Sequence, residues 1–275
     1  MFFNNYSKPG KGVEKRDPNQ SRISVFFDIL PRKIWFLFKL NLINILASTP
    51  FFVIVMIVVG IVSLPMINVA QINLNISDVA RIDTILRWGL TYVYMILLGM
   101  GPSTAAYLYI VRKTVEERYC WLISDFFEAY KTNFKKSILL VLIDVFVFCL
   151  LVGAFKFYSH SELLVLQCII VCVGCIYAVM HIYIYQMIIT FELTFKNVLR
   201  NAFLLLVMKA PISIIVILLN VIIKIIIPAL FFVKIDNFTL AIILVLFDVL
   251  FVAPTFDFAT NFYIIPMLKK YIAGE

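Results

Sequence analysis

The sequence predicts an all-α fold, a polytopic membrane helical bundle of six transmembrane helices with amphipathic cytoplasmic or interfacial helices. Composition is the first reason. Of the 275 residues, 63% are hydrophobic and 15% are charged, whereas a soluble domain is about 45–50% apolar and about 25% charged. The mean hydropathy of +1.00 agrees. A soluble core could not bury this excess, so the composition excludes a soluble enzyme, a disordered chain and a nucleic-acid-binding module.

The second reason is the length of the apolar runs. A membrane-crossing helix needs about 20 mostly apolar residues, and six segments rich in Ile, Val, Leu and Phe meet that requirement. Such lengths exclude buried strands and the short alternating pattern of an outer-membrane barrel. The six predicted spans are residues 34–62, 85–111, 138–155, 163–189, 202–233 and 239–268.

The third reason is the distribution of Lys and Arg, which also predicts orientation. The N-terminal arm, the loops after the second and fourth spans, and the C-terminal tail together hold 17 of the 24 basic residues, and the alternate loops hold 4. The positive-inside rule then places both termini in the cytoplasm. The predicted organisation is a basic cytoplasmic arm with an interfacial helix (residues 1–33), a membrane domain (34–268) and a short cytoplasmic tail (269–275). The net charge of +8 thus faces anionic lipid headgroups, and we expect no nucleic-acid partner.

The loop after the second span predicts an amphipathic helix between Thr114 and Phe134. Apolar and aromatic residues recur there at spacings of three, four and one, with charged residues mostly on the other side. This helix could lie in the headgroup region or dock a cytoplasmic partner. The residues of its apolar face are Ile123, Phe126, Phe127, Tyr130 and Phe134.

Ionisable residues inside predicted spans are the candidates for function, because charge at membrane depth is costly. They are Asp144, Lys209, Lys224, Asp248 and Asp257, to which His181 is added with less weight. Counting residues from the span ends places Lys224 at the depth of Asp248, and Lys209 at the depth of Asp257. We therefore expect two buried pairs, Lys224–Asp248 and Lys209–Asp257, which could be structural salt bridges or line a proton or solute pathway.

No catalytic motif is found in the sequence. It has two histidines and lacks the zinc-protease, serine-hydrolase and phosphate-binding patterns. The cysteines have no histidine or carboxylate at ligand spacing. We expect no catalytic activity, metal or cofactor.

Two blocks of the sequence resemble the YesL-like family, bacterial membrane proteins of unknown biochemical function. One block is Phe2-Phe3-Asn4-Asn5-Tyr6 with Lys8-Pro9-Gly10, and the other runs from Gly101-Pro102-Ser103-Thr104-Ala105-Ala106 to Asn133-Phe134-Lys135. The resemblance implies a protein of the bacterial plasma membrane that is often encoded near carbohydrate ABC importers. It supplies no catalytic residue.

The second block also has a direct physical interpretation. Small side chains let another helix approach closely, and proline bends a helix. The block is therefore a helix-packing notch or a kink that lines a solute path, formed by Gly99, Gly101, Pro102, Ser103 and Ala105.

Two functions follow from these features. The first is an accessory or regulatory component of carbohydrate uptake, without catalysis of its own, whose partners are the lipid bilayer, an ABC permease or another membrane protein, and further copies of itself. The second is a small-solute or proton-coupled transporter or channel that uses the buried Lys–Asp pairs. Co-purification with a permease supports the first, whereas loss of flux in a folded Asp248→Asn variant supports the second.

Overall fold

The computed structural model describes residues 21–63, 89, 94, 98–159, 164–234 and 237–273. These residues form helices and turns, and no strand occurs among them. The all-α prediction is confirmed. The elements are α1 (Arg22–Ser63), α3 (Pro102–Val115), α4 (Leu122–Ser159), α5 (Leu164–Thr190), α6 (Phe195–Met208), α7 (Ala210–Val221), η2 (Ile222–Ile226), α8 (Ile227–Lys234), α9 (Phe238–Phe247), η3 (Asp248–Val252), α10 (Ala253–Leu268) and η4 (Lys269–Ala273), where η marks a π-helix.

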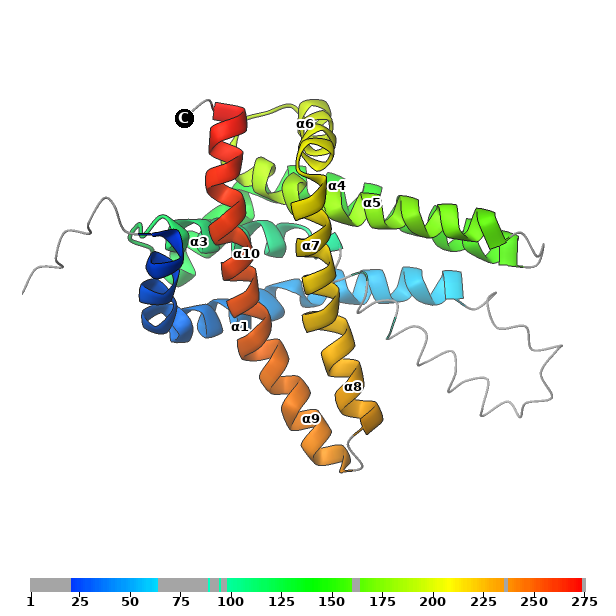
Figure 1. Cartoon of the computed structure of the whole chain (residues 1–275), viewed down its shortest axis with the longest axis horizontal. Coiled ribbons are helices and arrows are strands. Elements are labelled where there is room, and N and C mark those ends of the chain that lie inside the picture. Colours follow the sequence, from blue (N-terminus) through cyan, green and yellow to red (C-terminus); the bar gives the residue numbers. More distant parts are fainter. Residues whose placement is uncertain are drawn as a thin grey trace, which may run out of the picture.

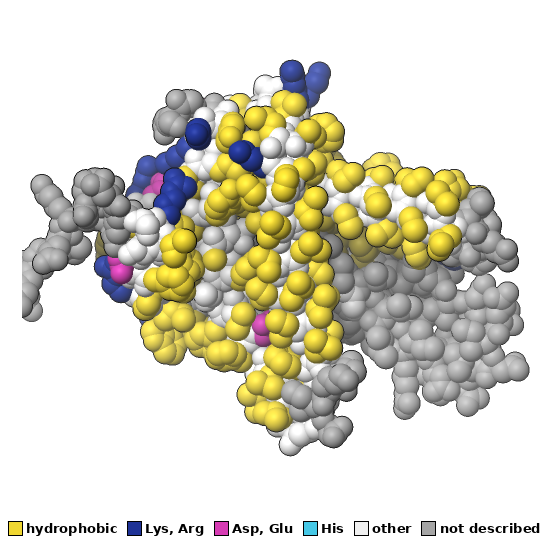
Figure 2. All heavy atoms as spheres, viewed as in Figure 1, with side chains coloured by type: hydrophobic (Ala, Val, Ile, Leu, Met, Phe, Trp, Pro, Cys, Tyr) yellow, Lys and Arg dark blue, Asp and Glu magenta, His cyan; other side chains and the backbone are white. Residues whose placement is uncertain are grey.

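Within the described residues, five helices are long and apolar enough to cross a membrane, which makes the chain a multi-pass membrane protein. Their apolar side chains are largely exposed on the protein, as expected where lipid covers them. Figure 2 shows hydrophobic side chains along α5, α7 and α8, while Lys and Arg gather toward the end that holds α3, α6 and the C-terminal part of α10. The five segments are Arg22–Val59, Leu122–Tyr158, Leu164–Thr190, Ala210–Phe231 and Thr239–Tyr271.

The short helix α3 lies at the centre of the bundle and packs against α1, α4, α5 and α10. Its Ala105, Ala106 and Ile110 are fully buried. Around it, α4 and α5 form one long hairpin, and the continuous rods α7–η2–α8 and α9–η3–α10 form another (Figure 1). In Figure 1 the two hairpins leave the central region in different directions.

The predicted second span, residues 85–111, differs from expectation. Most of its first part lies outside the described residues, and the described part is broken at Gly99–Gly101 before α3 begins at Pro102. With 14 residues, α3 is about 21 Å long, shorter than the roughly 30 Å of a bilayer core. The prediction of six continuous spans is therefore approximate.

The predicted separate amphipathic helix from Thr114 to Phe134 is wrong in its bounds. The helix α3 ends near Glu117, which adopts a left-handed φ of 52°, and α4 then runs without interruption from Leu122 into the third predicted span. Lys135, Lys136 and Ser137 link the two predicted segments and are all compatible with a helix, so nothing interrupts it.

Helix boundaries also differ at the N-terminus and in the fifth span. The first helix starts at Arg22 instead of residue 34 and contains Pro31 and Pro50; Figure 1 shows its first turns bent away from the rest, as proline predicts. The fifth span, predicted as residues 202–233, is divided at Lys209, where α6 ends and α7 begins ahead of Pro211. The residues before position 21 and after position 273 lie outside the described part of the chain.

Candidate functional site

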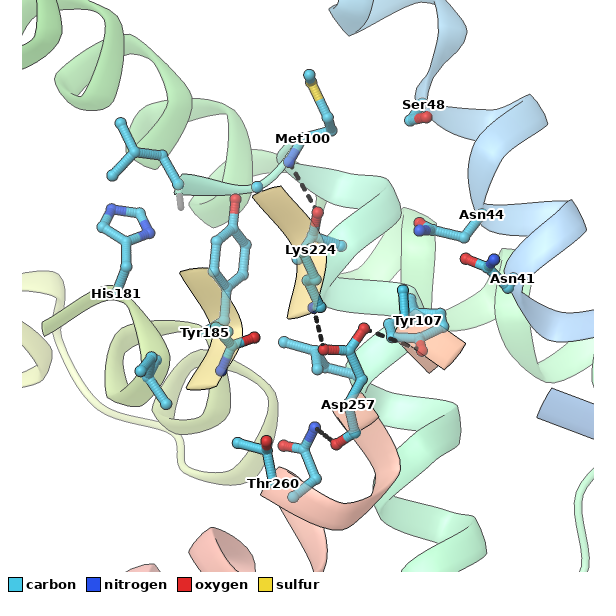
Figure 3. A pocket seen from close by; sticks show the side chains of 18 of the residues that line it. Asn41, Asn44, Ser48, Met100, Tyr107, His181, Tyr185, Lys224, Asp257 and Thr260 are labelled. Atoms are coloured by element: carbon cyan, nitrogen blue, oxygen red, sulfur yellow. Dashed lines mark hydrogen bonds and ion pairs between the residues drawn. The ribbon is translucent and has the colours of Figure 1, made fainter. Parts of the chain in front are cut away.

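A polar cavity of about 220 Å³ lies where α1, the Gly99–Gly101 break, α5, η2, η3 and α10 converge. Side chains from these elements point toward one another around it, with His181 and Tyr185 on one side and Asn41, Asn44 and Ser48 on the other (Figure 3). Fourteen of its lining side chains are amides, hydroxyls, carboxylates, lysine or histidine: Asn41, Asn44, Ser48, Thr104, Tyr107, His181, Tyr185, Gln186, Asn220, Lys224, Asp248, Asp257, Thr260 and Asn261. So much polarity inside apolar helices indicates a functional site.

The cavity contains an ion pair between Lys224 on η2 and Asp257 on α10. The second oxygen of Asp257, Oδ2, accepts a hydrogen bond from the Tyr107 hydroxyl on α3 at 3.3 Å, and Figure 3 shows both interactions. Three elements are thereby joined at one carboxylate.

This ion pair corrects the predicted Lys209–Asp257 pair. Lys209 lies at the α6–α7 junction, with its ammonium 4.8 Å from the centre of the Tyr271 ring. The break before Pro211 moves Lys209 out of the helical register that the depth count assumed. Lys224 and Asp248, the other predicted pair, line the same cavity, but the ion pair that Lys224 forms there is with Asp257.

A chain of amides ends in a free acceptor at the cavity wall. Asn261 donates through Nδ2 to the backbone oxygen of Asp257 at 2.7 Å, and its Oδ1 accepts from Nε2 of Gln186. Because the amide nitrogen of Gln186 donates to Asn261, the carbonyl oxygen of Gln186 is the group left to accept a hydrogen bond. Gln186 is 1% exposed, and its Oε1 has no hydrogen-bond partner within the described part of the chain.

Two π-helical segments bring charge into the cavity. Lys224 lies on η2 and Asp248 on η3, and π-helical turns are frequent at functional sites. Asn41 on α1 donates to the backbone oxygen of Val249 at 2.9 Å, which anchors η3. Asp248 is 3% exposed, and its Oδ2 has no hydrogen-bond partner among the residues described. It is a second buried acceptor at the cavity.

The remaining predicted ionisable residue, Asp144 on α4, is buried beside the cavity wall. Its Oδ1 lies 2.6 Å from Nε2 of His181 and accepts a hydrogen bond from the Tyr177 hydroxyl, also at 2.6 Å. His181 itself lines the cavity. The third predicted acidic group is therefore separated from the Lys224–Asp257 pair and has a histidine partner.

The small-residue block forms the turn that precedes α3. Gly99 and Gly101 have φ angles of 79° and 64°, which favour glycine. A Cβ on Gly101 would lie 2.7 Å from Cγ2 of Val141 on α4. Pro102 is at the first turn of α3, Ser103 donates to the Met100 carbonyl oxygen, and Ala105 is fully buried. The sequence predicted a helix-packing notch or a kink within a span; in the structure the block starts a helix, with Ser103 and Ala105 buried.

Outside the predicted spans, an ionic network closes what we call the basic end, defined by Arg112, Lys113, Arg118 and Lys269. Arg112, Arg118 and Lys269 all contact Glu116 at 2.9–3.1 Å. Burial opposes ionisation of Glu116, but hydrogen bonds from Lys269 and Arg112 outweigh it and hold its pKa below the ordinary value of 4.5. The network links the end of α3 to the C-terminal η4.

A second ion pair at the basic end joins Lys113 to Asp125 at 2.8 Å. The hydrogen bond to Asp125 raises the pKa of Lys113, although burial acts against it. This contact fixes the turn between α3 and α4.

The predicted amphipathic face of α4 is divided between two environments. Phe126 is fully buried in a cluster with α1 and α3, whereas Ile123, Phe127 and Phe134 are exposed. Tyr130 is half-buried and packs against the same cluster.

The uncharged polar residues of the cavity are those that sequence reasoning missed. Asn41, Asn44 and Ser48 lie three and four residues apart within an apolar run, so they share one helix face. Gln186 and Asn261 are likewise amides within predicted spans. Polar spacing inside apolar segments, and not charge alone, was the available signal.

One protein-family model matches the chain, over residues 84–154, and its description is "Protein of unknown function, DUF624". This model is the domain of the YesL-like family. The match covers the Gly101 turn, α3 and most of α4 with Asp144, and it ends before His181, Lys224 and Asp257. No curated protein and no solved structure matches the chain.

Proposed function

We propose that the protein binds a small, neutral, polyhydroxylated solute in the central cavity and moves it across the bacterial plasma membrane. This transport would be part of carbohydrate uptake. The observation that carries this proposal is the set of buried, unpartnered acceptors that line a polar cavity inside membrane-crossing helices. Gln186 Oε1 and Asp248 Oδ2 are both free within the described residues. Burying such groups without partners is unfavourable, so they favour a ligand that donates hydrogen bonds.

The other amides of the cavity support a donor ligand. The side-chain nitrogens of Asn41 and Asn220 are already used, by the backbone oxygens of Val249 and Val216. Their carbonyl oxygens are left for other partners. Sugars and polyols present many hydroxyl donors in a small volume, and a cavity of about 220 Å³ is below the usual size of drug-binding pockets. The solute class is therefore small.

The depth of the cavity supports transport. Lys224 is 7 residues from Phe231 and 14 from Ala210, the ends of its candidate span, which places it about 10 Å and about 21 Å from them. Transporter sites commonly lie near the midplane, at interrupted helices. Here the Gly99–Gly101 break and two π-helical segments border the cavity.

The experiment is binding and flux of a defined panel by the purified full chain. We would measure thermal shift in detergent, and uptake into proteoliposomes, with neutral pentoses and hexoses, glycerol, and putrescine as a cationic donor. A neutral sugar should bind. Gln186→Leu should lower the affinity for that sugar about tenfold, because one lost hydrogen bond is worth about 1.4 kcal/mol. Asp248→Asn should remove flux while the protein stays folded.

The control is Cys172→Ala, on the exposed side of α5, which should leave binding unchanged. Putrescine binding without sugar binding would reject the neutral solute class. Absence of binding across the panel would reject the proposed function.

The accessory role in carbohydrate uptake is the second candidate, favoured by exposed aromatic side chains beside the basic end. Tyr119 and Trp121 are 74% and 67% exposed and contact each other edge to face, and Phe127 is exposed on the following helix. These side chains could meet a permease or lipid headgroups. Purification in mild detergent should recover a permease with the wild type and lose it with Trp121→Ala; recovery of the protein alone would count against this role.

We further propose that the basic end faces the cytoplasm. The grouping of Lys and Arg at that end (Figure 2) supports this orientation under the positive-inside rule. A C-terminal green fluorescent protein should be fluorescent, whereas a C-terminal alkaline phosphatase should be inactive. The reverse result would invert the topology.

A further inference from the structure

We propose that Asp144 and His181 form a proton-binding site, and that its proton is exchanged through the solute cavity. The site is separate from the Lys224–Asp257 pair and uses side chains of α4 and α5. Its existence does not depend on the proposed solute, but its coupling to solute binding rests on the proposed function.

The first argument is charge. Asp144 is 0% exposed and His181 is 2% exposed, on helices that are able to cross a membrane. An isolated carboxylate in such a place is very unfavourable. Within the described residues, His181 is the one basic side chain that forms an ion pair with Asp144, since Lys224 is bonded to Asp257. One proton held by the pair makes it neutral, and its loss leaves one negative charge in the membrane.

The second argument is the set of groups that surround the pair. Besides His181, the titratable groups that interact with Asp144 are the phenols of Tyr94, Tyr177 and Tyr185. The Tyr177 hydroxyl donates to Asp144, and the Tyr185 hydroxyl accepts from the Gly101 backbone nitrogen at 3.0 Å. Phenols are neutral near pH 7, so none of these three balances the charge of the carboxylate. The balancing charge has to come from a proton.

The third argument is the route. His181 lies between the two sites, because Nε2 faces Asp144 while the residue lines the cavity. Its Nδ1 is buried and has no hydrogen-bond partner in the described part of the chain. A proton from the cavity can bond to Nδ1, and the proton on Nε2 then either stays on the imidazolium or moves along the 2.6 Å contact to Oδ1 of Asp144. In that neutral state the extra proton can lie on either side of the contact. With it on His181, one N–H bond has formed at Nδ1 and Nε2 keeps its own proton, so an imidazolium faces the Asp144 carboxylate; in each case the pair gains one proton.

The test of the proton site is nitrogen-15 magnetic resonance of histidine in the full chain, reconstituted in liposomes. The chain has two histidines, so His160→Gln leaves one signal, that of His181. Across a series of pH values, this signal should change between the neutral and imidazolium forms as the pair gains or loses its proton. In Asp144→Asn the imidazolium form should disappear, because no carboxylate remains to balance it.

Tyr177→Phe is the matched control, since it removes the phenol hydrogen bond and keeps both members of the pair, so the imidazolium form should persist. If Asp144→Asn does not fold, His181→Asn together with proton uptake read by a pH-sensitive dye gives the same test. A His181 signal that stays in one form at every pH, or that is unaffected by Asp144→Asn, would overturn the proton site.

The coupling is tested by the affinity of the best-binding panel sugar at about pH 6 and about pH 8. If one proton binds with each solute, affinity changes by up to about tenfold per pH unit, and His181→Asn should abolish the dependence. A wild type with pH-independent binding would overturn the coupling. If no sugar binds, the proposed function fails, while the magnetic resonance result still decides the proton site.

Discussion

The Lys224–Asp257 ion pair gives the most direct test of how the cavity is held together. Three variants isolate it: Lys224→Met, Asp257→Asn and the two changes combined. Methionine keeps most of the lysine volume without charge, and asparagine can still bond to Tyr107, which contacts Asp257 at 3.3 Å. Each single change therefore removes one member of this ion pair, and the double change removes both.

The expected magnitude follows from burial. Breaking a fully buried pair by removing one partner costs about 3–5 kcal/mol. The Lys224 and Asp257 side chains are 13% and 25% exposed, so solvent reduces the cost to about 2–3 kcal/mol for each single change. The double variant should lose only about 1–2 kcal/mol, because no unpaired charge remains. The interaction energy of the cycle is then about 3 kcal/mol.

The assay is the free energy of unfolding in mixed detergent and dodecyl sulfate micelles, followed by circular dichroism of the helices. A second cycle, Lys209→Met with Asp257→Asn, is the matched control, since Lys209 contacts Tyr271 and not Asp257. Its two changes should be additive. Additivity in the Lys224 cycle, or coupling in the Lys209 cycle, would refute the assignment of the pair.

Three further stability predictions follow from the same structure. Gly101→Ala should lower the free energy of unfolding by about 2–6 kcal/mol, the sum of backbone strain of about 1–3 kcal/mol and overpacking of about 1–3 kcal/mol. Adding Val141→Ala to the same chain should recover only the overpacking part in the same unfolding assay. Glu116→Gln should lower the free energy of unfolding by about 1–3 kcal/mol near neutral pH. Because the folded-state pKa of Glu116 is lowered, this difference from wild type should be complete at pH values above 4.5 and disappear as the pH falls through the folded-state pKa. A difference that persists in acid would refute this. Phe126→Ala should cost about 3–5 kcal/mol, whereas Phe127→Ala, exposed beside it, should cost less than about 1 kcal/mol; equal costs would contradict the division of this helix face.

Hydropathy predicted the membrane-crossing core of the fold but not the ends of its helices. The fourth predicted span, residues 163–189, differs by one residue at each end from α5 (Leu164–Thr190). By contrast, α4 begins at Leu122, 16 residues before the predicted third span. Hydropathy reports transfer into lipid, whereas helix formation continues wherever no residue breaks it. Hydropathy therefore does not detect polar or amphipathic helical turns that extend a membrane-crossing helix.

Depth along the membrane normal led to three ionisable residues that do line one cavity, Lys224, Asp248 and Asp257, but it did not predict which of them form the ion pair. The count fixes how far a residue lies from the membrane surface, but not its rotation about the helix axis or the effect of a break. The turn at Lys209 and the π-helical turn at Lys224 both change that rotation. Asp257 therefore bonds to Lys224, and pairing of this kind needed the three-dimensional structure.

The irregular parts of the backbone explain why the cavity exists where it does. Helices inside a membrane satisfy their own backbone groups, and a break is tolerated where protein buries it or where it lines a cavity. The described chain has a break at Gly99–Gly101 and π-helical turns in η2 and η3 at membrane depth, and residues of all three line one cavity. At the break, the Gly101 nitrogen is satisfied by Tyr185 and the Met100 nitrogen by Thr104. The Gly101 turn and η2 are more than 120 residues apart in the sequence. If each of the three irregular segments served only local packing, they would not meet at one polar cavity. Their convergence is the reason to place solute binding there, and it makes the Gly101 turn, within the segment matched by the family model, part of the same site as Lys224 and Asp257.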